Sequence, residues 1–145
     1  MYSTNIEGNR FSIKCLTVLE QKFALNNFLV DTGAVITCCE HKYIDTALNE
    51  KDLVHCEPKI IGGLVNGSTV KFYRYPLKRF TVGTIDLGKQ DIWITFDARV
   101  TDIVLGMDIL RQIVLIINLY NQKIYFCKDA RDYEQSFQLM VEMVK

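Results

Sequence analysis

The stretch Phe28–Ala34 constrains the chain more than any other, because an apolar run with β character leads directly into an Asp-Thr-Gly tripeptide. The side chain of Asp31 is costly to bury unless it is hydrogen-bonded, paired or used in chemistry. Gly33 allows the backbone to turn sharply just after the carboxylate. We therefore predict an acidic group held at the end of a buried strand, with Thr32 beside it as a hydrogen-bonding support. Taken alone, the tripeptide favours an ordinary turn after a strand, so the rest of the chain must decide.

The composition limits the classes of partner. The 145 residues are the size of one domain and are 49% hydrophobic, and seventeen basic side chains balance seventeen acidic ones. This neutrality argues against nucleic acid or an acidic membrane surface as the main partner. The first ten residues lack the apolar core of a signal peptide, and apolar runs such as Ile113–Ile117 are too short to span a bilayer. Five cysteines without regular spacing predict reduced thiols and a cytoplasmic location.

Most of the chain is patterned as short strands, which predicts a mainly β protein in a single domain over residues 1–145. Residues 11–19 and 23–30 form an expected antiparallel pair around the polar turn Glu20–Lys22. Further expected strands are Val35–Cys39, Ile92–Phe96, Val114–Asn118 and Lys123–Phe126. The core of the domain is expected over about residues 11–127. The tail, about residues 129–145, carries Phe137, Met140, Val141 and Val144 at helical spacing and predicts an amphipathic helix.

The segment Lys59–Phe72 predicts a hairpin. Two β-prone arms flank a stretch with three glycines, and Asn66-Gly67 is a strong hairpin signal. Glycines near a hairpin tip weaken packing and raise mobility. By itself this is most simply a surface hairpin.

A second strand resembles the first in ending near a glycine. Ile103-Val104-Leu105 runs into Gly106, about 75 positions after the strand that leads to Gly33. We expect the two strand ends to meet near one centre. A short helix is expected after Gly106, with Asp108 in its first turn, where a carboxylate suits the helix dipole.

Together these features resemble the retropepsin-like aspartic proteases, the single-domain relatives of pepsin. The motifs that match in order are Asp31-Thr32-Gly33-Ala34, a glycine-bearing flap at about residues 60–72, and Val104-Leu105-Gly106 before a short helix. The Leu-Gly-Met-Asp-Ile-Leu form of the third motif is more similar to the cellular and bacterial branch than to the viral enzymes. Viral members commonly carry an arginine soon after that glycine, and this chain does not.

The resemblance implies an acid-protease β-barrel and hydrolysis of peptide bonds by two aspartates and one water, without a metal or other cofactor. One Asp-Thr-Gly per chain then requires a homodimer, with Asp31 from each subunit as the catalytic residue. By resemblance, Thr32 braces the pair of aspartates across the interface, and Gly33, with Ala34 after it, lets substrate approach. The flap residues Ile61, Gly62, Gly63, Leu64 and Val65 would bind an extended peptide through main-chain hydrogen bonds. Apolar lining residues lead us to expect hydrophobic side chains on either side of the cut.

Three alternatives stay open at this stage. Asp108 could pair with Asp31 inside one chain, although it lacks a following Thr-Gly and is better interpreted as a helix-start residue. Cys38, Cys39, His41, His55 and Cys56 could be imagined as a zinc site, but adjacent strand residues point to opposite faces and the spacing is wrong. The domain could also be a catalytically silent module for dimerisation or peptide binding.

Overall fold

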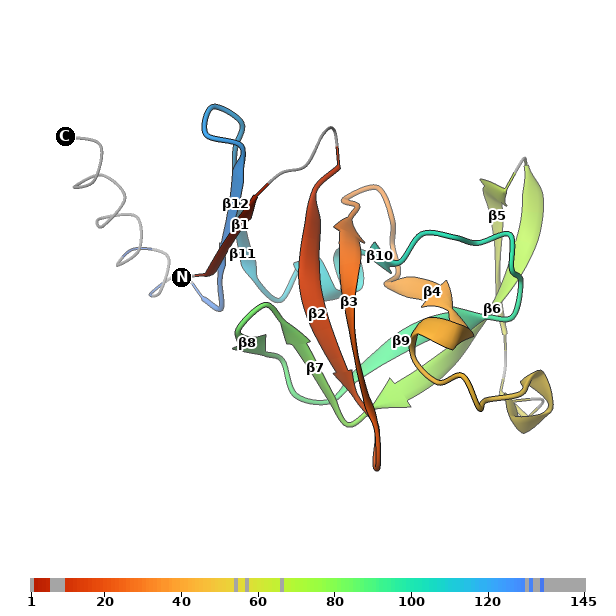
Figure 1. The fold of residues 1–145 in the computed structure, drawn as a ribbon. Helices are drawn as coiled ribbons and strands as arrows, with labels where there is room; N and C mark the ends of the chain where they lie inside the picture. Colours follow the sequence, from red (N-terminus) through yellow and green to blue (C-terminus); the bar gives the residue numbers. More distant parts are fainter. Residues whose placement is uncertain are drawn as a thin grey trace.

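The computed structural model describes residues 2–5, 10–53, 55–56, 58–65, 67–129, 131 and 134. Short strands dominate these residues, which confirms the mainly β, acid-protease-like fold class (Figure 1). The elements in chain order are β1 (Tyr2–Asn5), β2 (Ser12–Val18), β3 (Phe23–Val30), β4 (Cys38–Glu40), the 3₁₀ helices η1 (His41–Tyr43) and η2 (Glu50–Leu53), β5 (Lys59–Val65), β6 (Ser68–Leu77), β7 (Arg79–Val82), β8 (Ile85–Asp86), β9 (Gln90–Thr95), β10 (Val104–Leu105), α1 (Met107–Leu110), β11 (Val114–Asn118) and β12 (Lys123–Cys127).

The larger sheet has nine strands in the order β5-β6-β9-β4-β10-β3-β2-β7-β8, and within the described residues it stays open between β5 and β8. β2 and β3 form the predicted antiparallel pair. β10 lies parallel to β3, with Val104 opposite Leu29 and Leu105 opposite Val30. The two strand ends that were expected to meet are therefore direct neighbours in the sheet.

Alternation along β3 separates a core face from an open face. Phe28 and Val30 are buried, and the ring of Phe28 packs edge-on against Phe80 with centroids 5.6 Å apart. Asn27 is exposed and Leu29 is half-buried, and neighbouring residues of a strand point to opposite faces. The core thus holds β3 by one face and leaves the other face available.

Adjacent residues of β4 belong to two different clusters. Cys39 lies in the main core, whereas Cys38 packs in a second cluster with Ile36, Val70 and Phe72. This is the opposite-face arrangement that argued against a zinc site. Cys15, Cys38, Cys39 and Cys56 are free thiols in the described part of the chain.

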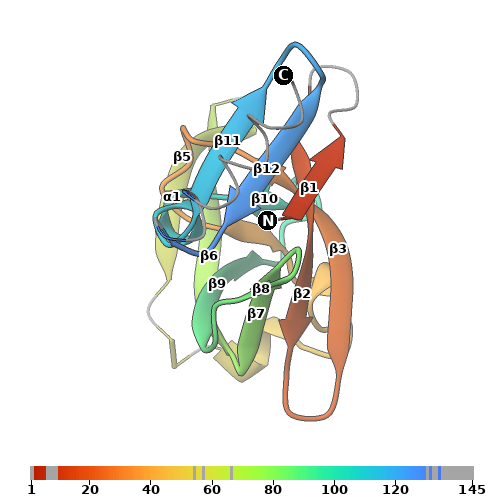
Figure 2. The same cartoon turned by 90° about the vertical axis from the view of Figure 1, so that its left-hand side faces the viewer.

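A three-stranded sheet, in the order β1-β12-β11, stands beside the larger one (Figure 2). It contains the predicted pair β11–β12, extended by β1, which pairs antiparallel with β12. The predicted apolar stripe of the tail, Phe137, Met140, Val141 and Val144, lies outside the described residues. No helix in the described part of the chain is long and apolar enough to cross a membrane.

Candidate active site

Asp31 is the first residue after β3, and backbone hydrogen bonds fix its position. Val30 donates its N–H to the carbonyl oxygen of Phe11 at 2.7 Å, and Asp31 donates its own N–H to that of Leu105 at 3.1 Å. The first partner precedes β2 and the second ends β10, so the chain is held from both neighbouring strands. A half-buried carboxylate is therefore carried on a rigid support, as predicted.

The Asp-Thr-Gly tripeptide forms a tight turn around that carboxylate. Gly33 donates its N–H to Oδ1 of Asp31 at 2.9 Å, and Ala34 donates its N–H to the carbonyl oxygen of Asp31 at 3.1 Å. A Cβ added at Gly33 would lie 3.2 Å from the same Oδ1, which is tighter than ordinary packing. Glycine at position 33 therefore keeps the carboxylate in place, and the neighbouring Thr32 is exposed.

The start of α1 clamps the segment that follows. Met107 and Asp108 donate their N–H groups to the carbonyl oxygens of Ala34 and Val35, at 2.8 and 3.2 Å. A Cβ at Gly106 would come within 2.3 Å of the carbonyl oxygen of Ile36, so only glycine allows this approach. These bonds explain why the strand expected over Val35–Cys39 begins only at Cys38: the earlier carbonyls already bond to the helix.

The hydroxyl of Thr37 joins the loop after β3 to the start of α1. The side chain is fully buried, donates to Oδ1 of Asp108 at 2.7 Å and accepts the N–H of Gly106 at 2.9 Å. Oδ1 of Asp108 also accepts the N–H of Ile109 at 2.9 Å. Asp108 is therefore the predicted residue in the first turn of α1, and its carboxylate serves the bridge to Thr37. Sequence reasoning missed Thr37, although a lone hydroxyl in an apolar run needs a buried partner.

The thiol of Cys38, at the start of β4, is buried and is not a candidate nucleophile. Burial raises its pKa to about 12, and the negative charges of Asp108 and Asp31 add to the rise. The thiolate is the reactive form of cysteine. The described residues also contain no group of three or more His, Cys, Asp or Glu side chains that could hold a metal ion.

β5 and β6 form the predicted hairpin, whose tip lies at the same end of the molecule as the loop after β3 (Figures 1 and 2). Its pairing slips between Ile61 and Val65, and Gly67 adopts a φ of 75° at the turn. Ile61 packs against the second cluster, which also contains Cys38. The hairpin is thus anchored through Ile61 to the cluster that contains Cys38, the first residue after the loop that follows β3.

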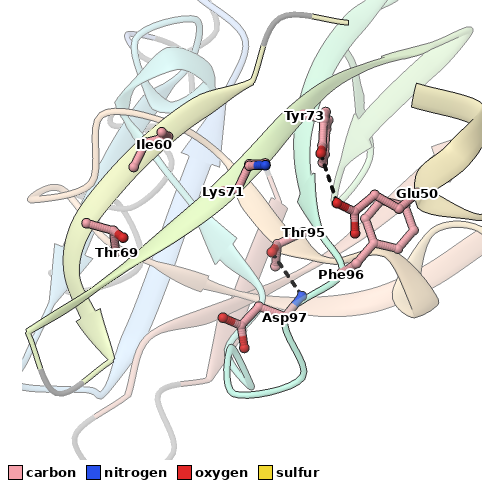
Figure 3. Close-up of a pocket in the computed structure, with 8 residues that line it drawn as sticks. All are labelled: Glu50, Ile60, Thr69, Lys71, Tyr73, Thr95, Phe96 and Asp97. Atoms are coloured by element: carbon pink, nitrogen blue, oxygen red, sulfur yellow. Dashed lines mark hydrogen bonds between the residues drawn. The ribbon is translucent and has the colours of Figure 1, made fainter. Parts of the chain in front are cut away.

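Two hollows matter for locating the chemistry. One, of about 450 Å³, contains the hydroxyl of Tyr73 bonded to Glu50 and includes no residue of the loop after β3 (Figure 3). Its lining residues are Glu50, Ile60, Thr69, Lys71, Tyr73, Thr95, Phe96 and Asp97. The other, of about 310 Å³, is lined by Arg10, Ser12, Asn27, Leu29, Thr101, Asp102 and Ile103. Of these two hollows, only the second touches the strand that delivers Asp31.

The fold and the clamped Asp-Thr-Gly turn define an acid-protease-like class, and comparison with protein families agrees. Residues 17–109 match a family described as aspartyl protease. The match covers well over half of the chain and contains Asp31, the β5–β6 hairpin and Gly106, so the chain belongs to this aspartyl protease family of the retropepsin-like clan. A comparison with curated proteins gave no match. The resemblance inferred from the motifs is confirmed.

Proposed function

We propose that the protein is an aspartic endopeptidase that works as a homodimer, hydrolysing peptide bonds with water activated between two Asp31 carboxylates. The observation that carries the proposal is the half-buried carboxylate of Asp31 on a loop held by backbone bonds to Phe11, Leu105 and α1. Such a fixed, accessible acid suits proton transfer, which needs stable geometry first. Membership of an aspartyl protease family supports the same activity.

A second copy of the chain is the proposed source of the second carboxylate. The rival inside the chain, Asp108, is bonded through Oδ1 to Thr37 and to the N–H of Ile109. The turn next to Asp31 faces outward in the single chain, with Thr32 and Gly33 exposed and Val35 70% exposed. A twofold contact at this turn would cover Val35 and bring the two Asp31 side chains together. Thr32 is proposed to brace the pair from across that contact.

The proposed reaction needs no metal or other cofactor. Two carboxylates in contact share one proton, because like charges so close cannot both ionise. The ionised Asp31 accepts a proton from water, whose oxygen bonds to the carbonyl carbon, while the protonated Asp31 donates to the carbonyl oxygen. The tetrahedral intermediate then breaks its C–N bond as the amide nitrogen takes a proton, which releases a carboxylic acid and an amine.

The β5–β6 hairpin is proposed to act as the flap. An extended peptide lying over the loop after β3 could be covered by main-chain groups of Ile61–Val65, adding to the free edge of β5. The edge position of β5 in the described sheet and the anchoring of Ile61 beside Cys38 support this role. Gly62 and Gly63 would give the arm its freedom to open and close.

The test is cleavage of a mixed peptide library by the purified protein, read by mass spectrometry. Wild type should cut, and Asp31→Asn, which keeps the shape and removes the acid, should lose about 10²–10⁴-fold in kcat. Adding excess Asp31→Asn chains to wild type, with time to exchange, should suppress activity through dimers with one carboxylate. Full activity from a species that light scattering shows to be monomeric would refute the shared site. A folded dimer that binds peptides without cutting them would instead support a silent binding module.

A further inference from the structure

The hollow of about 450 Å³ lies on the face of the β5–β6 hairpin that is turned away from the second cluster (Figure 3). Val70 and Phe72 of β6 belong to that cluster. Neighbouring residues of a strand point to opposite faces, so Thr69 and Lys71 lie on the other face, where they line the hollow. A molecule bound there would contact the hairpin and leave the loop after β3 uncovered.

The opposite wall of the hollow belongs to the body of the domain. η2 supplies Glu50, and the end of β9 with the segment that follows it supplies Thr95 and Phe96. Phe96 packs against the main core, and its ring lies edge-on to that of Tyr73 with centroids 6.1 Å apart. Because one wall is the hairpin and the other is attached to the core, a ligand in the hollow would tie the two together.

The charged groups of the hollow leave one cation and one carboxylate without an ionic partner. Asp97 is already paired, since its Oδ2 lies 2.6 Å from Nη2 of Arg99. Glu50 accepts the neutral hydroxyl of Tyr73 at 3.1 Å and forms no salt bridge within the described residues. Lys71 is exposed and also forms no salt bridge in that part of the chain. The hollow is therefore lined by an unpaired ammonium and an unpaired carboxylate.

A buried hydroxyl gives the hollow a further donor. Thr95 is only 1% exposed, and its Oγ1 accepts the N–H of Asp97 at 3.1 Å. No group among the described residues accepts the proton of this hydroxyl, although buried polar groups are normally paired. A carboxylate held by Lys71 would offer that acceptor, and an ammonium group on the same ligand would find Glu50.

We propose that this hollow binds a free α-amino acid with a large apolar side chain, and that binding holds the β5–β6 hairpin and slows proteolysis. Glu50 would repel a purely anionic ligand and Lys71 a purely cationic one, whereas a zwitterion satisfies both. The apolar side chain would lie against Ile60 and Phe96, and a volume of about 450 Å³ suits a small molecule. The effect on turnover rests on the proposed function, because a flap must open and close in each cycle. The binding itself does not depend on it.

The first test measures binding without measuring activity. Amide NMR spectra of the isotope-labelled protein are recorded while L-phenylalanine, phenylalaninamide or N-acetylphenylalanine is added. Phenylalaninamide lacks the carboxylate, and N-acetylphenylalanine lacks the ammonium group. We expect L-phenylalanine to shift the signals of the lining residues with a Kd of about 1 mM, as for other ligands of this size. Each derivative should bind about tenfold more weakly, because one charged contact is lost. Equal binding of the three probes, or no shift at the lining residues, would overturn the proposal.

Variants that each remove one charge identify the groups that bind the ligand. Lys71→Met should weaken binding of L-phenylalanine by about tenfold but not that of phenylalaninamide. Glu50→Gln should weaken binding of L-phenylalanine but not that of N-acetylphenylalanine. Lys51→Met is the matched control, since it removes an exposed charge of η2 that does not line the hollow. An equal loss of affinity in the control would show that net charge alone is responsible and would overturn the proposal.

The second test measures regulation on a peptide that the wild-type protein cuts. Saturating L-phenylalanine should lower kcat by about threefold or more with little change in KM, because it holds the hairpin and does not cover the loop after β3. A rise in KM alone would show competition for the peptide site and would overturn the regulatory part. If L-phenylalanine binds at the lining residues but wild type cuts no peptide, the proposed function fails and the binding site stands.

Discussion

The bridge made by Thr37 allows a quantitative prediction about the stability of the site. In Thr37→Val the shape is kept and the hydroxyl is lost, so the buried N–H of Gly106 and the carboxylate of Asp108 each lose a partner. A buried donor left without a partner costs about 1–3 kcal/mol, and a hydrogen bond to a charged group contributes about 1.5–3 kcal/mol. Because both losses come from one network, they are not fully additive. We expect the free energy of unfolding to fall by about 3 kcal/mol.

Thr37→Ser is the matched control, since it keeps the hydroxyl and removes only a buried methyl group. That change should cost about 1 kcal/mol. The two variants then differ by about 2 kcal/mol, which at a urea slope of about 2 kcal/mol/M separates their midpoints by about 1 M. The assay is urea unfolding at one fixed protein concentration, because association would shift the midpoint. Equal midpoints for the two variants would refute the reasoning that the hydroxyl joins the loop to α1.

Two further changes test the geometry around the site. Gly33→Ala should lower kcat by about tenfold or more, because the new Cβ displaces Oδ1 of Asp31. The melting temperature should stay nearly unchanged. An unchanged kcat would contradict this prediction. In the folded protein at pH 8, iodoacetamide should modify Cys56 first, since it is half-buried while burial raises the pKa of Cys38 to about 12. Mass spectrometry of the digested protein shows which thiol reacts. Labelling of Cys38 or Cys39 before Cys56 would contradict the burial of these two thiols.

Much of the fold could be predicted because its signals are local. The β2–β3 pair and the β11–β12 pair follow from alternating apolar residues on either side of polar turns, and the structure reproduces both. The two glycines of the site were also detectable as strand endings. The need for glycine at these positions comes from spatial neighbours, however. A Cβ at position 106 would meet the carbonyl of Ile36, and a Cβ at position 33 would crowd the carboxylate of Asp31.

The remaining features depend on contacts between distant parts of the chain. Thr37 bonds to a carboxylate 71 positions away, and Arg10 pairs with Asp102 across 92 positions. Isolated polar residues have no periodicity that reveals their partners. The strand expected from Val35 begins only at Cys38 because of another distant contact: the carbonyl oxygen of Val35 accepts a hydrogen bond from α1. The sequence thus located the acid and its turn, and the structure supplied what holds them.

The parallel pairing of β3 with β10 has a consequence for when the site can form. Leu29 and Val104 are partners although about 75 positions separate them, and contacts between such distant residues form late and slowly during folding. A growing chain that has not yet reached Leu105 already contains Asp31 but lacks the carbonyl that accepts its N–H. The chain's own topology therefore delays assembly of the acid's support until almost the whole sheet has been synthesised. Under the proposed function, this order of synthesis would keep an incomplete chain from cutting its surroundings.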